Sequence, residues 1–283
     1  MNFLAMHHIA SAFKKQGYYC PIRVCSAAEA FTLRHNLEQW EGMLEGGKAS
    51  KDMRFRPHLL LPWLWDLVMK PEVLDAVEAV LGPDVLAWSS EFNIKEPHTD
   101  SFFSWHQDST YAGLEPSDDV LTAWIALVDV NEANGCMQYI PGTHHKQLPH
   151  VETNDHNNML SRGQTIPNVV DESSAVNVVL KAGEMSLHHF RLVHRSGPNK
   201  TDDRRIGYTI RFISKRVALT TQRKVRESIT LCRGVYAPEE GNFDLDVRPD
   251  ELMGEAEVAR HREAMARENA NYFDSANVTG YKH

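Results

Sequence analysis

Four triplets in the sequence place a histidine two residues before a carboxylate. They are His98 with Asp100, His106 with Asp108, His150 with Glu152, and His261 with Glu263. Residues i and i+2 of a β-strand point to the same face, so such a pair can bind one metal ion from one side. His106 follows the strand-like run 102–105, whereas the other triplets lie in a predicted loop, after a proline or in a charged segment. His106 and Asp108 are therefore the best candidates for two metal ligands.

A third ligand must come from a distant part of the chain. His194 is the best candidate, because it ends a short apolar segment, 191–194, that runs into a turn. Two histidines and one carboxylate form a facial triad on ferrous iron that leaves three positions open, for a co-substrate and O2. His188 and His189 compete for this role, and strand alternation points only one of them inward, where it would form a pocket wall.

This chemistry also needs a cation for the far carboxylate of the co-substrate. Arg205 begins a predicted strand over 205–215, and its planar guanidinium can bond both carboxylate oxygens at once. Arg204 would take over this role if the strand register shifted by one residue. Arg211 shares the strand face of Arg205 by even spacing, and it is either a second anion contact or a buried structural charge.

The elements that must position these residues change character near Pro83. Before it, Ser26 is expected to cap a helix that ends at Gly46-Gly47, the segment 58–69 is apolar nearly all round, and Pro71 opens a third helix. After it, β-branched and aromatic segments predict eight strands, near 85–95, 101–107, 119–130, 136–140, 176–180, 184–189, 205–215 and 228–236. The sequence therefore predicts a mainly β fold with flanking helices, either a sandwich or a barrel.

Three further segments have distinct expectations. Residues 120–128 are apolar on both faces and predict a central strand that is covered on both sides. The polar segment 151–174 has no clear period and predicts a lid or a binding loop. The charged, Ala-rich segment 249–271 predicts a surface helix.

Composition narrows the class of protein. The chain has 283 residues, with 30 Lys and Arg against 38 Asp and Glu, for a formal net charge of −8. This balance argues against binding nucleic acid or an anionic membrane by bulk charge. No stretch approaches the roughly 18 apolar residues of a membrane span, and the 4 cysteines are too sparse for a disulfide scaffold. We therefore expect a soluble, cytoplasmic protein with reduced thiols, and the oligomeric state stays open.

The combined motifs resemble the phytanoyl-CoA dioxygenase family over roughly residues 55–215. The pattern consists of Trp105-His-Gln-Asp108, Trp124, the stretch 134–144, Gly183-Glu184, His194 with Ser196 and Asn199, and Arg205. The resemblance implies an Fe(II)- and 2-oxoglutarate-dependent oxygenase on a double-stranded β-helix, a jelly-roll and cupin-like core. It implies one domain over 1–283, with a helical lead-in over 1–83, the β-helix over 84–236 and a C-terminal helical segment over 237–283.

The resemblance also assigns roles to individual residues. It implies that His106, Asp108 and His194 ligate iron, and that Arg205 and Ser196 hold the distal carboxylate of 2-oxoglutarate. Trp124 would line that pocket and Asn93 would face the co-substrate. Relatives that halogenate have a small residue in place of Asp108, so its presence favours hydroxylation.

Within the family, the sequence is similar to the bacterial branch that acts on small molecules, and in particular to 2-aminoethylphosphonate dioxygenases. This similarity implies hydroxylation of an anionic small molecule at the carbon next to phosphorus, as a step in phosphonate degradation. Candidate substrate contacts are the cations, the histidine and the tyrosine of three loops, namely Lys51, Arg54, Arg56, His58, Tyr111 and Arg162. The alternatives are another small metabolite or an acyl-CoA in the same family, a zinc-dependent hydrolase, and a non-catalytic metal- or sugar-binding β-barrel.

Overall fold

The computed structural model describes residues 3–49, 52–153, 155–168, 171–220, 222–239, 241 and 243–274. Seven strands form a large sheet, in the order β1 (Tyr18–Arg23), β10 (Glu184–His189), β5 (Val120–Ala126), β12 (Arg205–Ser214), β2 (Val85–Lys95), β14 (Glu227–Arg233) and β15 (Phe243–Leu245). Four strands form a small sheet, in the order β3 (Phe103–His106), β11 (His194–Ser196), β6 (Met137–Tyr139) and β9 (Val176–Val178). All neighbours pair antiparallel except β14 and β15, which pair parallel.

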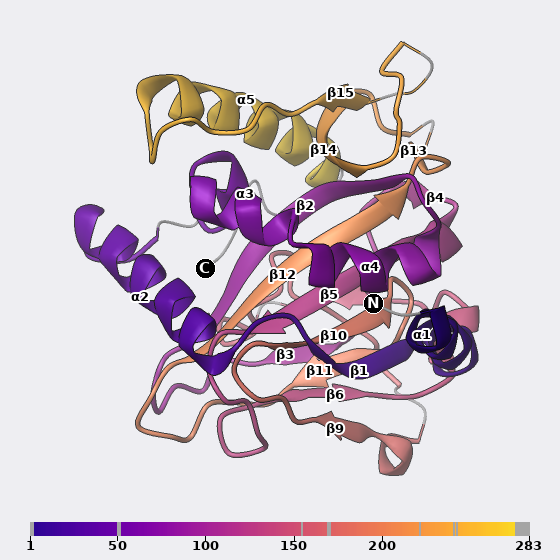
Figure 1. Ribbon diagram of the computed structural model, residues 1–283. Helices are drawn as coiled ribbons and strands as arrows, with labels where there is room; N and C mark the ends of the chain where they lie inside the picture. The colour runs from indigo at the N-terminus through magenta and orange to yellow at the C-terminus, as the bar shows by residue number, and fades with distance from the viewer. Residues whose placement is uncertain are drawn as a thin grey trace.

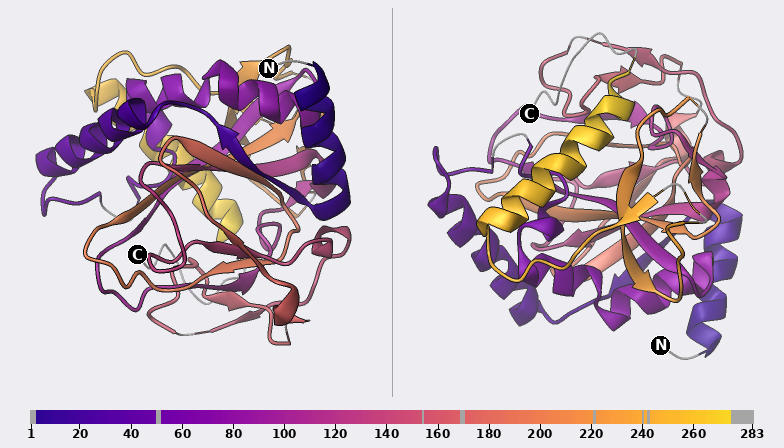
Figure 2. Two further views of the ribbon diagram at one scale, coloured as in Figure 1. Left: turned by 60° about the horizontal axis from the view of Figure 1, so that its bottom comes forward. Right: turned by 90° about the horizontal axis from the view of Figure 1, so that it is seen from above.

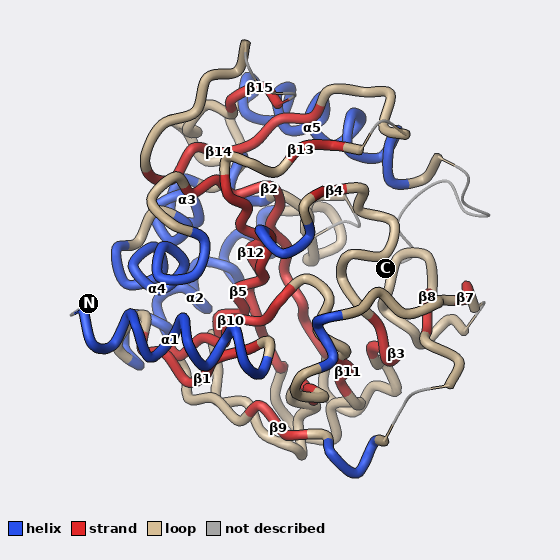
Figure 3. Tube along the Cα trace, turned by 90° about the vertical axis from the view of Figure 1, so that its right-hand side faces the viewer, coloured by secondary structure: helices blue, strands red, loops and turns tan. Residues whose placement is uncertain are grey.

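Four helices cover the outer face of the large sheet: α1 (Phe3–Gln16), α2 (Ala27–Met43), α3 (Pro62–Val68) and α4 (Pro71–Leu81). Figures 1 and 3 show the large sheet between these helices on one side and the small sheet on the other. The even-numbered residues of β12 from Ile206 to Phe212 join the apolar core that contains the helices. The odd-numbered Arg205, Thr209 and Arg211 line a cavity on the opposite face. Strand alternation therefore gives the large sheet an apolar outer face and a polar inner face.

A fifth helix, α5 (Glu255–Tyr272), lies at the β14 end of the large sheet and crosses it, as Figure 2 shows. The sequence predicts a surface helix here, but one face of α5 is buried. Its buried residues recur every three or four positions and are Glu257, His261, Ala264, Met265, Glu268 and Asn271. Nε2 of His261 donates to the carbonyl oxygen of Phe55 at 2.8 Å. The helix is therefore part of the packed structure rather than a peripheral addition.

Short elements complete the fold. Two-stranded sheets join β4 (Leu114–Glu115) to β13 (Ala218–Leu219) and β7 (Val151–Glu152) to β8 (Gln164–Thr165). Single 3₁₀ turns occupy Pro57–Leu59, Ser117–Asp119, Thr143–His145 and Glu172–Ser174.

The predicted fold class is confirmed, and strands 85–95 and 184–189 begin and end where expected. Ser26 caps α2 in a capping box with Glu29. The segment 58–69 does not form one helix, because Pro62 can occupy only the first turn of a helix, so a 3₁₀ turn precedes α3. The mainly helical lead-in also contains β1, an edge strand whose Pro21 weakens the local strand pattern.

Two other expectations need correction. The strand expected before His194 begins at His194 itself, because residues 190 and 191 form a turn. The polar segment 151–174 is not structureless, since it contains β7, β8 and a 3₁₀ turn. The described helices include none that is both long and apolar enough to span a membrane. The division into one domain with three segments and the cytoplasmic location stay predictions.

Candidate active site

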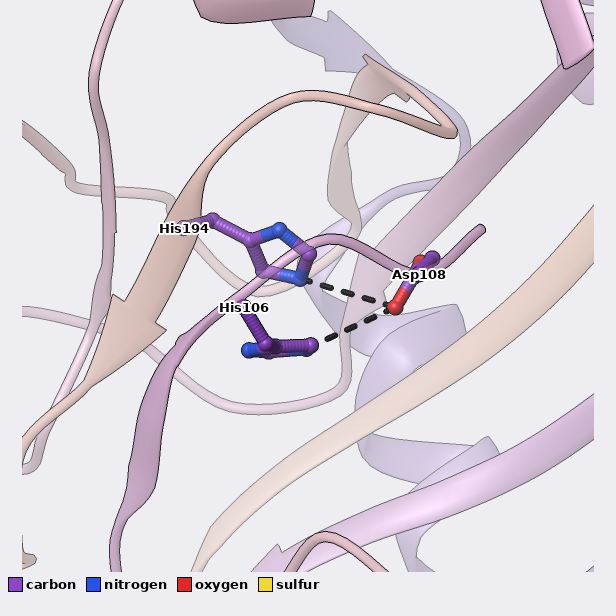
Figure 4. A group of neighbouring side chains, drawn as sticks. All are labelled: His106, Asp108 and His194. Carbon is purple, nitrogen blue, oxygen red and sulfur yellow. Dashed lines mark ion pairs between the residues drawn. The ribbon is translucent and has the colours of Figure 1, made fainter. Parts of the chain in front are cut away.

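His106, Asp108 and His194 converge between the two sheets (Figure 4). His106 ends β3 and pairs directly with His194, the first residue of β11. The Oδ1 atom of Asp108 lies 3.5 Å from Nε2 of His106 and 3.7 Å from Nε2 of His194. One ligand atom from each residue lies within 4.8 Å of the others. The structure therefore brings together the three residues that the sequence predicts as metal ligands.

Hydrogen bonds fix both imidazoles with Nε2 toward the common point. Nδ1 of His106 lies 2.8 Å from the carbonyl oxygen of Ser104, and Nδ1 of His194 lies 2.9 Å from that of Leu192. A carbonyl can only accept, so each Nδ1 carries the proton and each Nε2 presents a lone pair. Burial, with the nearby His106, holds the pKa of His194 well below its ordinary value. This arrangement suits metal ligation, which requires neutral imidazoles.

Asp108 is held as a carboxylate. Burial by itself would raise its pKa, but the charge of Arg211, together with the close approach of His106 and His188, outweighs it and holds the pKa well below the ordinary value. The hydroxyl of Thr122 donates to Oδ2 of Asp108 at 2.8 Å. Oδ1 stays directed at the two histidines (Figure 4).

The two competing histidines point in opposite directions, as alternation predicts. His188 lines the cavity, with Nδ1 2.9 Å from the Tyr139 hydroxyl and Nε2 3.5 Å from Oδ2 of Asp108. His189 faces α1, where its ring centroid lies 6.0 Å from that of Phe13. His188 therefore forms a wall beside the three converging residues.

The cavity encloses about 940 Å³, including its open mouth. Both sheets contribute to its wall, and so do the polar segment 151–174, through Met159, Leu160, Ser161 and Gln164, and α5, through Glu268 and Tyr272.

Arg205 lies at one end of this cavity and is 1% exposed. Its Nε and Nη2 atoms have no hydrogen-bond partner among the described residues, and its guanidinium lies 5.3 Å from the ring centroid of Trp124. Burial lowers its pKa to about 10. Arg204 instead forms ion pairs with Glu41 at 2.7 Å and Glu96 at 3.1 Å, so the strand register is the one that places Arg205 inward.

Ser196, Trp124 and Asn93 also line the cavity. Nδ2 of Asn93 donates to Oγ1 of Thr209 at 2.6 Å. The Ser196 hydroxyl oxygen accepts a hydrogen bond from Nζ of Lys95 at 2.6 Å, which leaves its own proton free to donate elsewhere.

Sequence reasoning missed Lys95, which is fully buried beside this end of the cavity. Its ammonium also donates to the carbonyl oxygens of Ser196, at 3.1 Å, and of Gly197. Burial and the charge of Arg205 hold the pKa of Lys95 well below its ordinary value. The even spacing from Asn93 along β2 was the available signal, because residues two apart share a strand face.

These residues fit an iron ion and a dicarboxylate. Two imidazole lone pairs and one carboxylate oxygen form the donor set of a facial triad. A buried guanidinium with two unpartnered nitrogens is costly by itself, so it calls for an anionic ligand.

The predicted basic substrate cluster does not lie at the cavity. Arg56 is fully buried, donating to Asp246 Oδ2 at 2.7 Å and to the carbonyl oxygen of Ser228 at 3.0 Å. His58 is also buried and lies 2.6 Å from the hydroxyl of Ser90. Because both side chains make long-range structural contacts and neither lines the cavity, the prediction that they bind substrate is corrected.

The other predicted substrate residues are placed as follows. The Arg54 guanidinium lies 5.0 Å from the ring centroid of Phe55, and Arg54 is not part of the cavity wall. Lys51 lies outside the described residues. Arg162 stacks on the Tyr111 ring at 3.6 Å and donates to Glu152 at 2.6 Å, and neither Arg162 nor Tyr111 lines the cavity. They pack the loop beside the cavity instead of facing a substrate.

The end of the cavity away from Arg205 has a different set of polar residues. Arg211 donates to Glu91 at 2.8 Å and lies 3.7 Å from Asp108, so this cavity-lining arginine is a paired, buried charge. Glu268 and Tyr272, one helical turn apart on α5, complete this end. Sequence reasoning missed them, although the spacing of 261, 264, 268 and 272 marks one helix face.

The sequence model of the family described as phytanoyl-CoA dioxygenase (PhyH) matches residues 13–207. The chain belongs to the phytanoyl-CoA dioxygenase family. The human peroxisomal phytanoyl-CoA dioxygenase is 31% identical over 148 residues, which cover 51% of this chain and 44% of the human protein. The "Probable alpha-ketoglutarate-dependent hypophosphite dioxygenase" of Stutzerimonas stutzeri is 30% identical over 180 residues, which cover 60% of this chain and 62% of that protein.

The matched regions thus span about half the length of these curated relatives. Among solved structures, the apo form of the non-heme monooxygenase ThoJ has a TM-score of 0.83 and 32% identity, covering 93% of this chain and 97% of that chain. These comparisons confirm, at the level of the family, the predicted enzyme class of 2-oxoglutarate-dependent dioxygenase and the predicted cofactors, iron and 2-oxoglutarate.

Proposed function

We propose that this chain is an Fe(II)- and 2-oxoglutarate-dependent hydroxylase of a small polar molecule. The observation that carries the proposal is the convergence of His106, Asp108 and His194 in the same cavity as Arg205, a buried guanidinium with unpartnered nitrogens. A zinc hydrolase or a non-catalytic barrel would have no use for that arginine.

In this proposal the three converging residues hold iron, which with 2-oxoglutarate and O2 supplies the oxidising power for C–H hydroxylation. Arg205 would donate two parallel N–H···O hydrogen bonds from its guanidinium to the distal carboxylate of 2-oxoglutarate. Ser196 would add its hydroxyl proton, since its oxygen is already oriented by Lys95. The Trp124 ring, held over Arg205, would exclude water from this contact and strengthen it.

We further propose that the substrate is a short organophosphonate, with 2-aminoethylphosphonate as the candidate, hydroxylated at the carbon next to phosphorus. The relative named as a hypophosphite dioxygenase supports a phosphorus oxyanion. The basic residues around Arg56 do not support this proposal, and the cationic side chains that line the cavity besides Arg205 are Arg195 and Arg211. A cavity with both cationic and acidic side chains in its wall suits a small zwitterion.

The test is succinate release from 2-oxoglutarate with added Fe(II) in the presence of one candidate substrate at a time. Product is followed by phosphorus NMR, and 2-aminoethylphosphonate is compared with a carboxylate analogue and a fatty acyl-CoA. We expect coupled turnover with the phosphonate only. Succinate formation with another compound and background rates with phosphonates would overturn the substrate but keep the hydroxylase. No succinate above the enzyme-free rate with any compound would overturn both.

A further inference from the structure

The cavity wall contains one buried acid whose charge has no counterpart. Glu268 is 6% exposed and lines the cavity from α5. Its Oε2 atom is buried with no hydrogen-bond partner, and no described residue forms an ion pair with its carboxylate. Its neighbour in the wall, Glu91, is already paired with Arg211 at 2.8 Å. A buried, unpaired carboxylate is costly, so it points to a missing partner.

The charges around Glu268 do not supply this partner. Arg56 and Arg211 act on it from a distance, but both are committed elsewhere, to Asp246 and to Glu91. Glu227 and Glu91 add negative charge near Glu268. Burial, reinforced by these two acids, raises the pKa of Glu268 to about 7. Acids with such perturbed pKa values in a cavity wall are frequent at binding sites.

The position of Glu268 separates it from the co-substrate. Arg205 and Arg211 lie at opposite ends of the inward-facing positions of β12, six residues and about 20 Å of strand apart. Glu91 and Arg211 lie at the Glu268 end, and Arg211 lies 3.7 Å from the metal-site residue Asp108. The helix α5 also lies outside the segment 13–207 that the family model matches. Glu268 is therefore placed to contact the substrate rather than the co-substrate.

We propose that Glu268 binds a cationic amino group of the substrate, and that this carboxylate makes the enzyme select amines over uncharged isosteres. The proposal deepens the proposed function and rests on it, because it names the group that would receive the ammonium end of a zwitterion such as 2-aminoethylphosphonate. The cation would replace the missing partner of Glu268 and form a charge-assisted hydrogen bond.

The experiment measures equilibrium binding by calorimetry to the full chain loaded with Ni(II) and 2-oxoglutarate, which needs no turnover. The probes are 2-aminoethylphosphonate, its isostere propylphosphonate, in which a methyl group replaces the ammonium, and β-alanine as an amine without phosphorus. The variants are Glu268→Gln, Glu268→Asp, and Glu263→Gln as a control on the exposed face of the same helix. The side chain of Glu263 is 64% exposed.

We expect Glu268→Gln to weaken binding of the amine probes about tenfold or more, since a hydrogen bond to a charged group is worth at least about that factor. Propylphosphonate binding should not change, Glu268→Asp should restore part of the affinity, and Glu263→Gln should match the unaltered enzyme. Amine affinity should also fall as the pH drops below about 7, where Glu268 takes up a proton, and this pH dependence should vanish in Glu268→Gln.

The outcomes separate the two proposals. Equal loss of amine and isostere binding in Glu268→Gln, or no loss at all, overturns the role of Glu268 whether or not 2-aminoethylphosphonate is the substrate. Binding of β-alanine but not of the phosphonates, with the same dependence on Glu268, supports the role of Glu268 and removes the phosphonate. No preference for any amine over propylphosphonate overturns the inference.

Discussion

At the Arg205 end of the cavity, every functional side chain is carried by a strand of one of the two facing sheets or lies within two residues of one. At the Arg211 end, strands supply Glu91 and Arg211, but the rest of the wall comes from the segment 151–174 and from α5. The first end lies within the segment that the family model matches, whereas α5 lies outside it. Rigid strands therefore carry the residues proposed to bind metal and co-substrate, and peripheral elements shape the part of the cavity that remains for a substrate.

The largest effect should come from the residues on which the strand-built end depends. Replacing His106 or His194 with Ala should lower turnover by at least about a thousandfold, because a facial triad has no redundant ligand. The control is His98→Ala, since the exposed His98 pairs with Asp202 and does not line the cavity. Succinate release and bound iron measure the result. Full activity and normal iron content in His194→Ala would transfer the role to His188.

The next largest effect concerns Arg56, a predicted substrate contact that the structure shows in a buried ion pair with Asp246. Replacing Arg56 with Met should cost about 3–5 kcal/mol of unfolding free energy, because it leaves the buried partner charge of Asp246 uncompensated. Denaturant titration of the iron-free protein measures this loss. The KM of the folded fraction should not change. A large rise in KM at unchanged stability would restore Arg56 as a substrate contact.

A smaller effect is expected at the co-substrate contact. Replacing Arg205 with Ala should raise the 2-oxoglutarate concentration needed for half-maximal rate by roughly 10- to 100-fold, because hydrogen bonds to a charged group contribute about 1.5–3 kcal/mol. Arg204→Ala should leave this requirement nearly unchanged and lower only stability, since Arg204 pairs with Glu41 and Glu96. The opposite ranking of the two variants would contradict the strand register seen here.

Gly207 offers a subtler test of the same end. A Cβ atom at Gly207 would lie 1.9 Å from the Trp124 ring, so Gly207→Ala must displace that ring from Arg205. We expect a stability loss of about 1–3 kcal/mol, as for other overpacked sites, together with a weaker response to 2-oxoglutarate. The matched control is Gly197→Ala, where a Cβ would meet nothing within 4 Å. Equal behaviour of the two alanine variants would show that Trp124 has no part in the pocket.

The smallest expected effect is a pH dependence at the α5 end. The pKa of Glu268 is raised to about 7 in the folded chain from an ordinary 4.5, so the folded state binds the proton more tightly than the unfolded state. Its contribution to stability is therefore complete below about pH 4.5 and is lost as the pH rises to about 7. Denaturant titrations at pH 5 and pH 7.5 should show a smaller drop for Glu268→Gln than for the unaltered chain. Identical drops would mean that Glu268 titrates normally.

Local patterns in the sequence determined much of the strand-built end. The inward alternation of His188 and Arg205 and the Ser26 cap follow from the geometry of one strand or one helix end, whereas Asp108 lies in the turn just after β3, two residues from His106. Such features depend on neighbours two to four residues away, so a sequence pattern is sufficient to predict them. The third ligand, His194, lies 86 residues after Asp108; its place at the end of the apolar segment 191–194 made it the candidate, and the resemblance to the family implied the same role.

The tertiary structure alone decided which charges face the cavity. Arg56 and His58 are residue types typical of an anion-binding site. However, Arg56 donates to Asp246, 190 residues away in sequence, and His58 lies within hydrogen-bond distance of Ser90 and Thr230. Glu268 lies in a charged segment that is typical of a solvated helix, but α5 packs so that the Glu268 side chain lines the cavity. Whether a charged side chain finds a distant partner, a cavity or solvent depends on which elements pack together, and no local periodicity of the chain encodes that packing.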